Sequence, residues 1–426
     1  MTKWMDYLDA VKSYSASWEE PQWMTDLRVS ALEKIEQLPL PVIEKVKFAR
    51  WSLYNVKTER QEAVGDVPSF DQIGDNPMVV QTGEQTILEQ ISPELAEKGV
   101  IFTDLMTAMQ EHPELVKEYY MTKAVPMDEN SLTALHAAFM NNGVFLYVPK
   151  NVVIEEALET LFIHNGDEDA HFFKHVLIIA EENSEFSYLE RFQSRGEAAK
   201  KLSGNVVVEV IAKPGARIKF SAVDSLGKNL ATYMNRRGYL MRDSMVDWAI
   251  GIMNDGNVVA DFDSDLVGDG AHAEVKIVAV STGKQIQGID TRVTNKAPHT
   301  IGHILQHGVI LEKSTLTFNG IGHILRGAKG ADAQQESRVL MLSTKSRGDA
   351  NPILLIEENE VTAGHAASVG RIDPEELFYL MSRGISKEEA ERLVIRGFLG
   401  PVITAIPVKT TRSQLIDTIE GKLTKK

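Results

Sequence analysis

The sequence predicts a mainly β protein with a parallel β-helix core, flanked by N-terminal and C-terminal α-helical regions. Of the 30 glycines, 22 lie between residues 143 and 370, among short β-type runs such as "NVVVEVIA" and "AEVKIVAV". Within that region "IGHIL" occurs at 301–305 and again at 321–325, a repeat at roughly 20 residues, and short strands that recur at such a period are typical of a solenoid with stacked coils. A sandwich or barrel also contains short strands, but it gives no reason for such a repeat.

Residues 1–142 are predicted to form the N-terminal helical region, with an extended connector near 55–100. "MTDLRVSALEKIEQL" places apolar residues at helical spacing, and the prolines of "QLPLP" end that helix. Residues 143–362 are predicted to be the β-helix core, because β-type runs there alternate with glycine-containing turns. Helical patterns are nearly absent from this part, which disfavours βαβ units and a Rossmann fold.

Residues 363–426 are predicted to be a short C-terminal helical region. Asp373 is a suitable N-cap for its first helix, and Gly384 follows that helix as a terminator. Ser386 begins a second helix, which Gly397 and Pro401 are expected to end, and a third helix follows near the C-terminus. The region is too short to hold a core of its own, so its apolar faces must pack on the β region or on a partner.

Composition excludes several classes of function. The net charge is −15, and no cluster of Lys and Arg is present, so nucleic acid and anionic membranes are not expected partners. No apolar run approaches the roughly 20 residues of a membrane span, and the N-terminus does not resemble a signal peptide. The absence of cysteine excludes disulfides, thiolate nucleophiles and Cys-ligated clusters within this chain. A cytoplasmic protein is therefore expected.

Nucleotide-binding loops are also missing. "STGKQ" at 281–285 contains a Gly-Lys pair, but it lacks the upstream glycine and the following Ser or Thr of a P-loop. The glycines of "NGIGHILRG" at 319–327 have the wrong spacing for a dinucleotide site. We therefore do not expect this chain to hydrolyse ATP itself.

Two groups of polar residues are weak candidates for a site. His299, His303 and His307 are four residues apart, and in a strand four residues span about 13 Å, too far to share one metal ion. We expect a polar edge instead, with His303 stacked near His323 on the next coil. Asp261, Asp263 and Asp265 of "DFDSDLVGDG" lie on one face of a strand, and a solvated acidic face is the favoured interpretation.

His365 is the third candidate. It lies in "TAGHAASVG", where small neighbours leave its imidazole uncrowded. A neutral imidazole can bind a borderline metal ion or carry a proton near pH 7. From residue types alone, the favoured alternative is a histidine that hydrogen-bonds the backbone at the end of the β region.

Long stretches of the chain resemble the SufB/SufD family of iron–sulfur cluster assembly proteins. The segment "GHAASVGRIDPEELFYLMSRGISKEEAERLVIRGFL" is similar to the C-terminal signature of that family. "GAKGADAQQESRVLMLS" resembles its late β-helix segment, and "GVFLYVPKNVVIEE" resembles its entry into the β region. "EEPQWMTDLRVSALEKIEQLPLP" is similar to the N-terminal segment of the SufD branch. The lack of the cysteine that SufB carries points to the same branch.

The resemblance implies a right-handed β-helix and a complex with SufB and with the ATPase SufC. It implies a non-catalytic scaffold, in which ATP hydrolysis by SufC moves the docked C-terminal regions and opens the SufB interface. The residues in the segment that would dock SufC are Phe378, Tyr379, Leu380, Arg383 and Gly384. Packing within the C-terminal region is the alternative role for these residues.

In the SufD branch a histidine faces the SufB cysteine across the interface, and His365 occupies the matching position. The resemblance therefore implies that His365 contributes to cluster assembly, as an iron ligand or as a proton carrier. No cofactor is expected to bind this chain stably, and the iron–sulfur cluster would form transiently at the SufB interface. A homodimer of the isolated chain is also an alternative, because an exposed strand edge can pair with a second copy.

Two rival functions stay open at this point. One is a cytosolic β-helix enzyme that acts on carbohydrate through Asp261 and Asp263, since grouped carboxylates serve such chemistry. The other is a purely structural homo-oligomeric β-helix protein, in which His365 would be dispensable.

Overall fold

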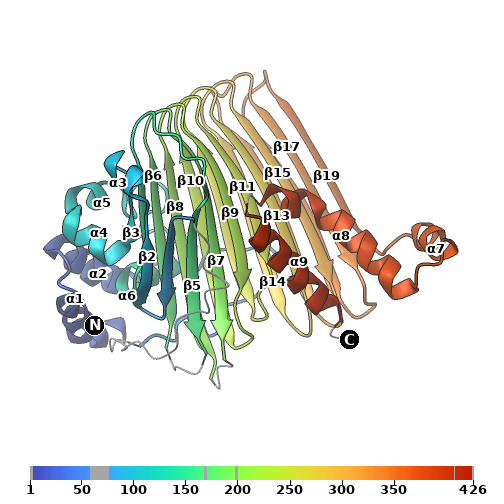
Figure 1. The fold of residues 1–426 in the computed structure, drawn as a ribbon, viewed down its shortest axis with the longest axis horizontal. Coiled ribbons are helices and arrows are strands. Elements are labelled where there is room, and N and C mark those ends of the chain that lie inside the picture. The colour runs from blue at the N-terminus through green and yellow to red at the C-terminus, as the bar shows by residue number, and fades with distance from the viewer. Residues whose placement is uncertain (1–2, 58–75, 167–169, 197–199, 407, 425–426) are drawn as a thin grey trace.

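Consecutive strands alternate between two sheets that face each other, and helices cover the outside of both sheets (Figure 1). The computed structural model describes residues 3–57, 76–166, 170–196, 200–406 and 408–424. Sheet neighbours in the core are two strands apart in sequence and pair in parallel, as in a coil that contributes one strand to each sheet. The predicted parallel β-helix is confirmed, with about 7 turns.

The ten-stranded sheet consists of β1 (Met78–Thr82), β2 (Gln85–Gln90), β5 (Leu158–Asn165), β7 (Glu185–Arg195), β9 (Arg217–Ser225), β11 (Met245–Ile252), β13 (His272–Ser281), β15 (Ile301–Ile310), β17 (Asp332–Met341) and β19 (Thr362–Gly370). The nine-stranded sheet consists of β3 (Ile101–Asp104), β4 (Gly143–Val148), β6 (Phe172–Ala180), β8 (Leu202–Ala212), β10 (Leu230–Leu240), β12 (Val258–Leu266), β14 (Ile286–Asn295), β16 (Thr315–Ile324) and β18 (Arg347–Ile356). The antiparallel pairs are β1 with β2 and β3 with β4, at the N-terminal end of the stack.

The coil repeat is longer than the sequence repeat suggested. His272, Ile301, Asp332 and Thr362 are register partners on successive coils, so each coil takes roughly 30 residues, within the usual range of solenoid repeats. One coil needs two full strands and two turns, and the spacing of the "IGHIL" copies is shorter than that. The two copies lie at the start of β15 and the end of β16, in different sheets. The expected stacking of His303 near His323 is therefore wrong.

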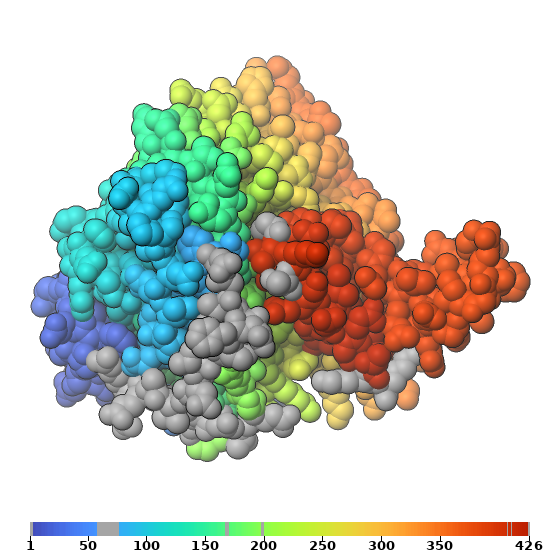
Figure 2. All heavy atoms as spheres, in the orientation of Figure 1, coloured from blue at the N-terminus to red at the C-terminus, as the bar shows by residue number. Residues whose placement is uncertain are grey.

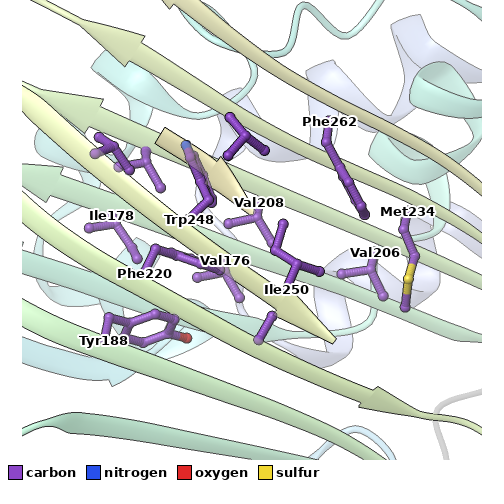
Figure 3. Packing of buried hydrophobic residues seen from close by; sticks show 14 of the residues in the cluster. Val176, Ile178, Tyr188, Val206, Val208, Phe220, Met234, Trp248, Ile250 and Phe262 are labelled. Carbon is purple, nitrogen blue, oxygen red and sulfur yellow. The ribbon is translucent and has the colours of Figure 1, made fainter. Parts of the chain in front are cut away.

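The space between the sheets is the main hydrophobic core, which we call the lumen. Side chains of both sheets meet there, as Figure 3 shows for Val176 and Val208 from one sheet and Phe220 and Trp248 from the other. The rings of Phe220 and Trp248 are 4.6 Å apart between centroids, on adjacent strands of one sheet. Side chains of a strand alternate between the lumen and the outer face of the sheet. Where helices also cover the outer face, every residue of the strand is buried, as in β6 and β8.

The N-terminal helices cover the outer face of the nine-stranded sheet. Their apolar residues form one cluster with Phe173, Leu177, Val207 and Ile211 of β6 and β8. These helical segments are η1 (Lys3–Tyr7), α1 (Leu8–Ser17), α2 (Gln22–Lys34), α4 (Leu105–Glu111), α5 (Pro113–Tyr119) and α6 (Ser131–Phe139). The short helix α3 (Pro93–Glu97) is different, because its buried Leu95 belongs to the lumen core. Part of the predicted connector, residues 58–75, lies outside the described residues. The rest is not simply extended, because it contains the β1–β2 hairpin and α3, and β1 extends the ten-stranded sheet beside β5.

Of the C-terminal helices, the second and third cover the outer face of the ten-stranded sheet, and the first projects beyond it (Figure 1). They are α7 (Pro374–Ser382), α8 (Lys387–Ala405) and α9 (Lys409–Thr424), so all three predicted helices are present. The prediction that Gly397 and Pro401 end the second helix is wrong, because α8 continues to Ala405. Its buried side chains Leu399 and Val402 lie on both sides of Pro401 and pack on the sheet, which offsets the cost of about 3 kcal/mol for proline inside a helix.

Candidate functional site

The solenoid ends in two strands that have a neighbour on one side only. β18 is the last strand of the nine-stranded sheet, and β19 is the last strand of the ten-stranded sheet. We call the end formed by these two strands the open end. Leu355, Ile356 and Val369 are exposed there, at 42%, 46% and 41% of their surface. Edge strands with unpaired backbone groups and exposed apolar side chains are suited to pairing with another chain.

His365 lies in the middle of β19 rather than in a linker, because the whole "TAGHAASVG" segment is a strand. The predicted boundary at residue 363 therefore falls inside the last strand of the solenoid. His365 is the register partner of Gln335, and the same face of β17 carries Ala333 and Val339, which belong to buried apolar clusters. By strand alternation, the His365 side chain lies on the lumen-facing side of the last coil.

The His365 imidazole is exposed because no further coil stacks on β19. The backbone hydrogen bond expected from residue types alone is absent: within the described ranges, no hydrogen bond or ion pair involves the ring. A ring nitrogen at the open end is thus accessible to a metal ion or to a partner chain.

Helix α7 carries the other predicted site residues and packs weakly on the rest of the chain. Asp373 caps it through a bond from the Glu375 N–H, 2.8 Å long, and Gly384 follows it at a φ of +88°, as predicted. None of its residues is buried, and Figure 2 shows the segment protruding from the body of the molecule. We call this projecting helix, which contacts the rest of the chain mainly through α8, the arm.

The exposed surface of this arm is strongly apolar. Phe378 is 72% exposed and Tyr379 is 56% exposed. The Arg383 guanidinium donates to the Tyr379 hydroxyl at 3.0 Å and lies 5.0 Å from its ring centroid. Leu380 is half-buried, and Gly384 is exposed. Large aromatic and Arg side chains are typical anchors of protein interfaces, so the geometry suits docking.

Asp261 and Asp263 share one face of β12, as predicted, but they do not form a solvated acidic face. Both lie beside the buried Arg237 guanidinium, whose Nη2 is 3.1 Å from Asp263 and 3.8 Å from Asp261, and which also contacts Glu129. Burial raises the pKa of Asp261 to about 6, against the lowering effect of Arg237. This arrangement ties the β12 carboxylates to the N-terminal region, as a structural ion-pair network.

The three histidines of "HTIGHILQH" make separate contacts. His299 is in a turn at a φ of +54°, whereas His303 and His307 lie on β15. His307 Nδ1 is 2.8 Å from the Phe398 carbonyl of α8, and its ring stacks on Phe398, so this residue anchors the C-terminal helices. A shared site of these three residues is excluded by their positions, as expected.

A different cluster brings one of these histidines together with residues of the preceding coil. His272 Nε2 and His303 Nδ1 lie 2.8 Å and 3.0 Å from the same oxygen, Oε1 of Glu274. Burial works against ionisation of Glu274, but the bonds to both imidazoles outweigh it and lower the pKa of this carboxyl to about 2. Sequence reasoning missed the cluster because the offset between β13 and β15 was unknown; a correct coil length aligns Glu274 with His303.

A second missed group is buried in the lumen. The Arg236 guanidinium bonds Glu190 on β7 and Asp224 on β9, with all three side chains fully buried. Burial raises the pKa of Glu190 to about 7, and Arg236 opposes that rise. The guanidinium joins the two sheets, since Arg236 belongs to β10 of the nine-stranded sheet.

Comparison with known proteins defines the class of this chain. The family described as "SUF system FeS cluster assembly, SufBD core domain" matches residues 162–398, and "SufBD protein N-terminal region" matches residues 66–160. These matches cover the β-helix and the segment that leads into it. The chain belongs to the SufB/SufD family.

Its relatives point to one branch. It is 44% identical to the iron–sulfur cluster assembly protein SufD of Bacillus subtilis strain 168, over 97% of both chains. It is 29% identical to an iron–sulfur cluster assembly SufBD family protein of Staphylococcus epidermidis, over 92% of this chain and 87% of that one. The chain is therefore SufD-like. Among the described helices, none has the length and hydropathy that crossing a bilayer requires.

Proposed function

We propose that this chain is a scaffold subunit of a SUF-type iron–sulfur cluster assembly complex. It pairs with SufB through the open end and docks the SufC ATPase through α7. ATP-driven motion of SufC pulls on the C-terminal helices and exposes the interface between the two β-helices, where iron and sulfide assemble into a transient cluster. Hydrolysis belongs to SufC, and this chain has no catalytic residue of its own.

The single observation that carries the proposal is the open end with His365 on its lumen side. A second β-helix stacked on β18 and β19 would continue both sheets and bury Leu355, Ile356 and Val369. His365 would then lie between the last coils of the two proteins, facing whatever the partner presents there. Imidazole binds iron without adding charge, which suits a ligand in a buried interface.

The position of α8 supports a mechanical link between α7, where SufC would dock, and the open end. α8 packs on β11, β13 and β15 through Ile395 and Leu399, while α7 projects beyond the sheet. A pull on α7 therefore acts through α8 on β15, which pairs with β17, the neighbour of β19. This connection favours coupling between SufC docking and the open end.

The two rival functions have less support. A carbohydrate enzyme centred on Asp261 and Asp263 would need carboxylates free for acid–base work, whereas both are held by Arg237. A homo-oligomeric β-helix would use the same open end, with a second copy of this chain as partner. Cross-linking at the open end separates these outcomes.

The lack of cysteine makes a direct test simple, because His365→Cys creates the only thiol of the chain. After mild oxidation of co-expressed proteins, we expect a disulfide between this chain and SufB. A Val153→Cys variant is the matched control: Val153 is 54% exposed, but it lies just before β5 at the opposite end of the solenoid, so it should not cross-link. A disulfide-linked homodimer as the sole product would support the structural rival instead, and equal cross-linking of both variants would refute the assigned interface.

The role of the imidazole is tested by reconstitution of the complex with SufB and SufC. His365→Ala should leave co-purification intact and reduce the cluster absorbance formed on addition of iron and sulfide. Wild-type cluster yield from the His365→Ala complex would overturn the role of His365 without affecting the scaffold proposal. Sugar turnover by the isolated chain would favour the enzyme.

A further inference from the structure

We propose that His272, Glu274 and His303 bind a divalent transition-metal ion on the outer face of the ten-stranded sheet. This inference does not depend on the proposed function, since the site lies on the outer face of the sheet, whereas His365 lies on the lumen side. The three side chains come from β13 and β15, and one ligand atom from each lies within 4.8 Å of the others. Among the described residues, this is the one such group that contains two imidazoles.

The two imidazole nitrogens already lie close to the same carboxylate oxygen. Glu274 Oε1 is 2.8 Å from His272 Nε2 and 3.0 Å from His303 Nδ1. Ligands at about 2.1 Å from a tetrahedral ion are separated by about 3.4 Å, so an ion enters by a small spreading of these groups. The strand register holds the geometry, because Glu274 and His303 are direct partners and His272 is two residues from Glu274 on the same face.

An outer layer of contacts orients one of the ligands. With Nδ1 of His303 turned to Glu274, its Nε2 faces Asp332 Oδ2 of β17 at 3.6 Å. That nitrogen is buried and has no hydrogen bond, so a slight tightening toward Asp332 would satisfy it. Imidazoles that bind metals commonly donate their second N–H to a carboxylate, which fixes the ring and raises its basicity.

Asp332 is itself held in place. Gln334 donates to its Oδ1 at 2.8 Å, and Gln334 lies beside Gly364 of β19. A Cβ at residue 364 would come within 2.5 Å of Gln334 Oε1, so glycine leaves the space that this amide occupies. The arrangement runs in order from the metal ligands to Asp332 and then to Gln334, across three neighbouring strands.

The donor set indicates which ions fit. Two imidazoles and one carboxylate suit Zn²⁺, and the same set with open positions suits Fe²⁺, whereas Ca²⁺ and Mg²⁺ prefer oxygen ligands. The ligand side chains are 25% to 33% exposed, so an ion can enter from solvent and keep open positions for water. The nearest cation on this face, Lys276, is paired with Asp247 and does not compete for Glu274.

Metal binding is tested on the untagged full chain after removal of bound metal with a chelator. Co²⁺ is the optical probe, and equilibrium dialysis against Zn²⁺ and, without oxygen, Fe²⁺ gives the stoichiometry. We expect one equivalent that is lost in His303→Ala and in Glu274→Gln, the second of which keeps the shape of the side chain. Asp332→Asn should weaken binding about 10- to 100-fold without changing the stoichiometry.

His323→Ala is the matched control. His323 Nε2 is 3.1 Å from Glu357, so it is a histidine–carboxylate pair on a strand that lacks the second imidazole. This variant should retain the full equivalent, because His323 lies outside the proposed set of ligands. Binding that is absent from the wild-type chain, or that survives unchanged in both His303→Ala and Glu274→Gln, overturns the proposal. Circular dichroism confirms that each variant is folded.

Discussion

Substitution of Phe378 by serine should weaken docking of SufC without affecting the stability of this chain. Phe378 is 72% exposed, and α7 contains no buried residue, so the folded chain loses little packing. The effect on the free energy of unfolding should stay within about 0.5 kcal/mol, as for other surface positions. In the proposed complex, by contrast, bound SufC would cover the Phe378 ring.

The size of the docking effect follows from the exposed area. A phenylalanine side chain buries about 150–250 Å² in an interface, so the 72% that is free corresponds to about 110–180 Å². At about 25 cal/mol per Å² this gives an upper limit of about 3–4.5 kcal/mol. The entropy cost of ordering side chains in the interface and imperfect packing reduce this limit, so the expected loss of binding free energy is about 2–3 kcal/mol. The dissociation constant should therefore rise about 30- to 150-fold.

The assay is calorimetric titration of SufC into the wild-type chain and into Phe378→Ser, with Val153→Ser as the matched control. Val153 is 54% exposed and lies just before β5, at the end of the solenoid opposite to α7, so its substitution should leave the affinity unchanged. Unchanged affinity of Phe378→Ser would refute docking through α7. A large fall in its melting temperature would show instead that the ring packs on this chain.

Three further predictions concern stability. Leu399→Ala should destabilise the chain by about 2–5 kcal/mol in urea unfolding, because this fully buried side chain packs α8 on the sheet; a loss below about 1 kcal/mol would contradict that packing. Arg236→Met should cost about 3–5 kcal/mol, because Glu190 and Asp224 would be left buried without their partner, and adding Glu190→Gln and Asp224→Asn to that variant should recover part of the loss. Burial raises the pKa of Asp290 to about 7, so the folded chain binds this proton more tightly than the unfolded chain. The stability that the protonated Asp290 contributes is therefore lost as pH rises from about 4 to 7. In Asp290→Asn the free energy of unfolding should change less with pH across that window, and an unchanged pH dependence would refute the assignment.

Much of the architecture is readable from local sequence. The β-type runs between glycines correspond to strands, because alternation and turn chemistry act over a few residues. Asp373 and Gly384 mark the ends of α7 for the same reason, since capping is a local interaction. The family resemblance also rests on continuous segments, and the comparisons confirm it.

The features that local sequence did not reveal depend on contacts between distant residues. The repeat of "IGHIL" was misleading, because coil length is set by how whole strands pack across the lumen. Pro401 remains inside α8 since burial against the sheet outweighs its local preference. Asp263 forms an ion pair with Arg237 on the neighbouring strand, and this contact becomes visible only when the pairing of β10 with β12 is known.

The sequence by itself determined the order of helices and strands, the absence of thiol chemistry and the place of His365 in a recognisable motif. Only the tertiary structure decided that His365 lies in the last strand of an open-ended solenoid. It also decided that the imidazoles of His272 and His303 both lie within hydrogen-bonding distance of Glu274. The physical reason is the strand register: partners that are a full coil apart in the chain become neighbours only when successive coils stack on a common core.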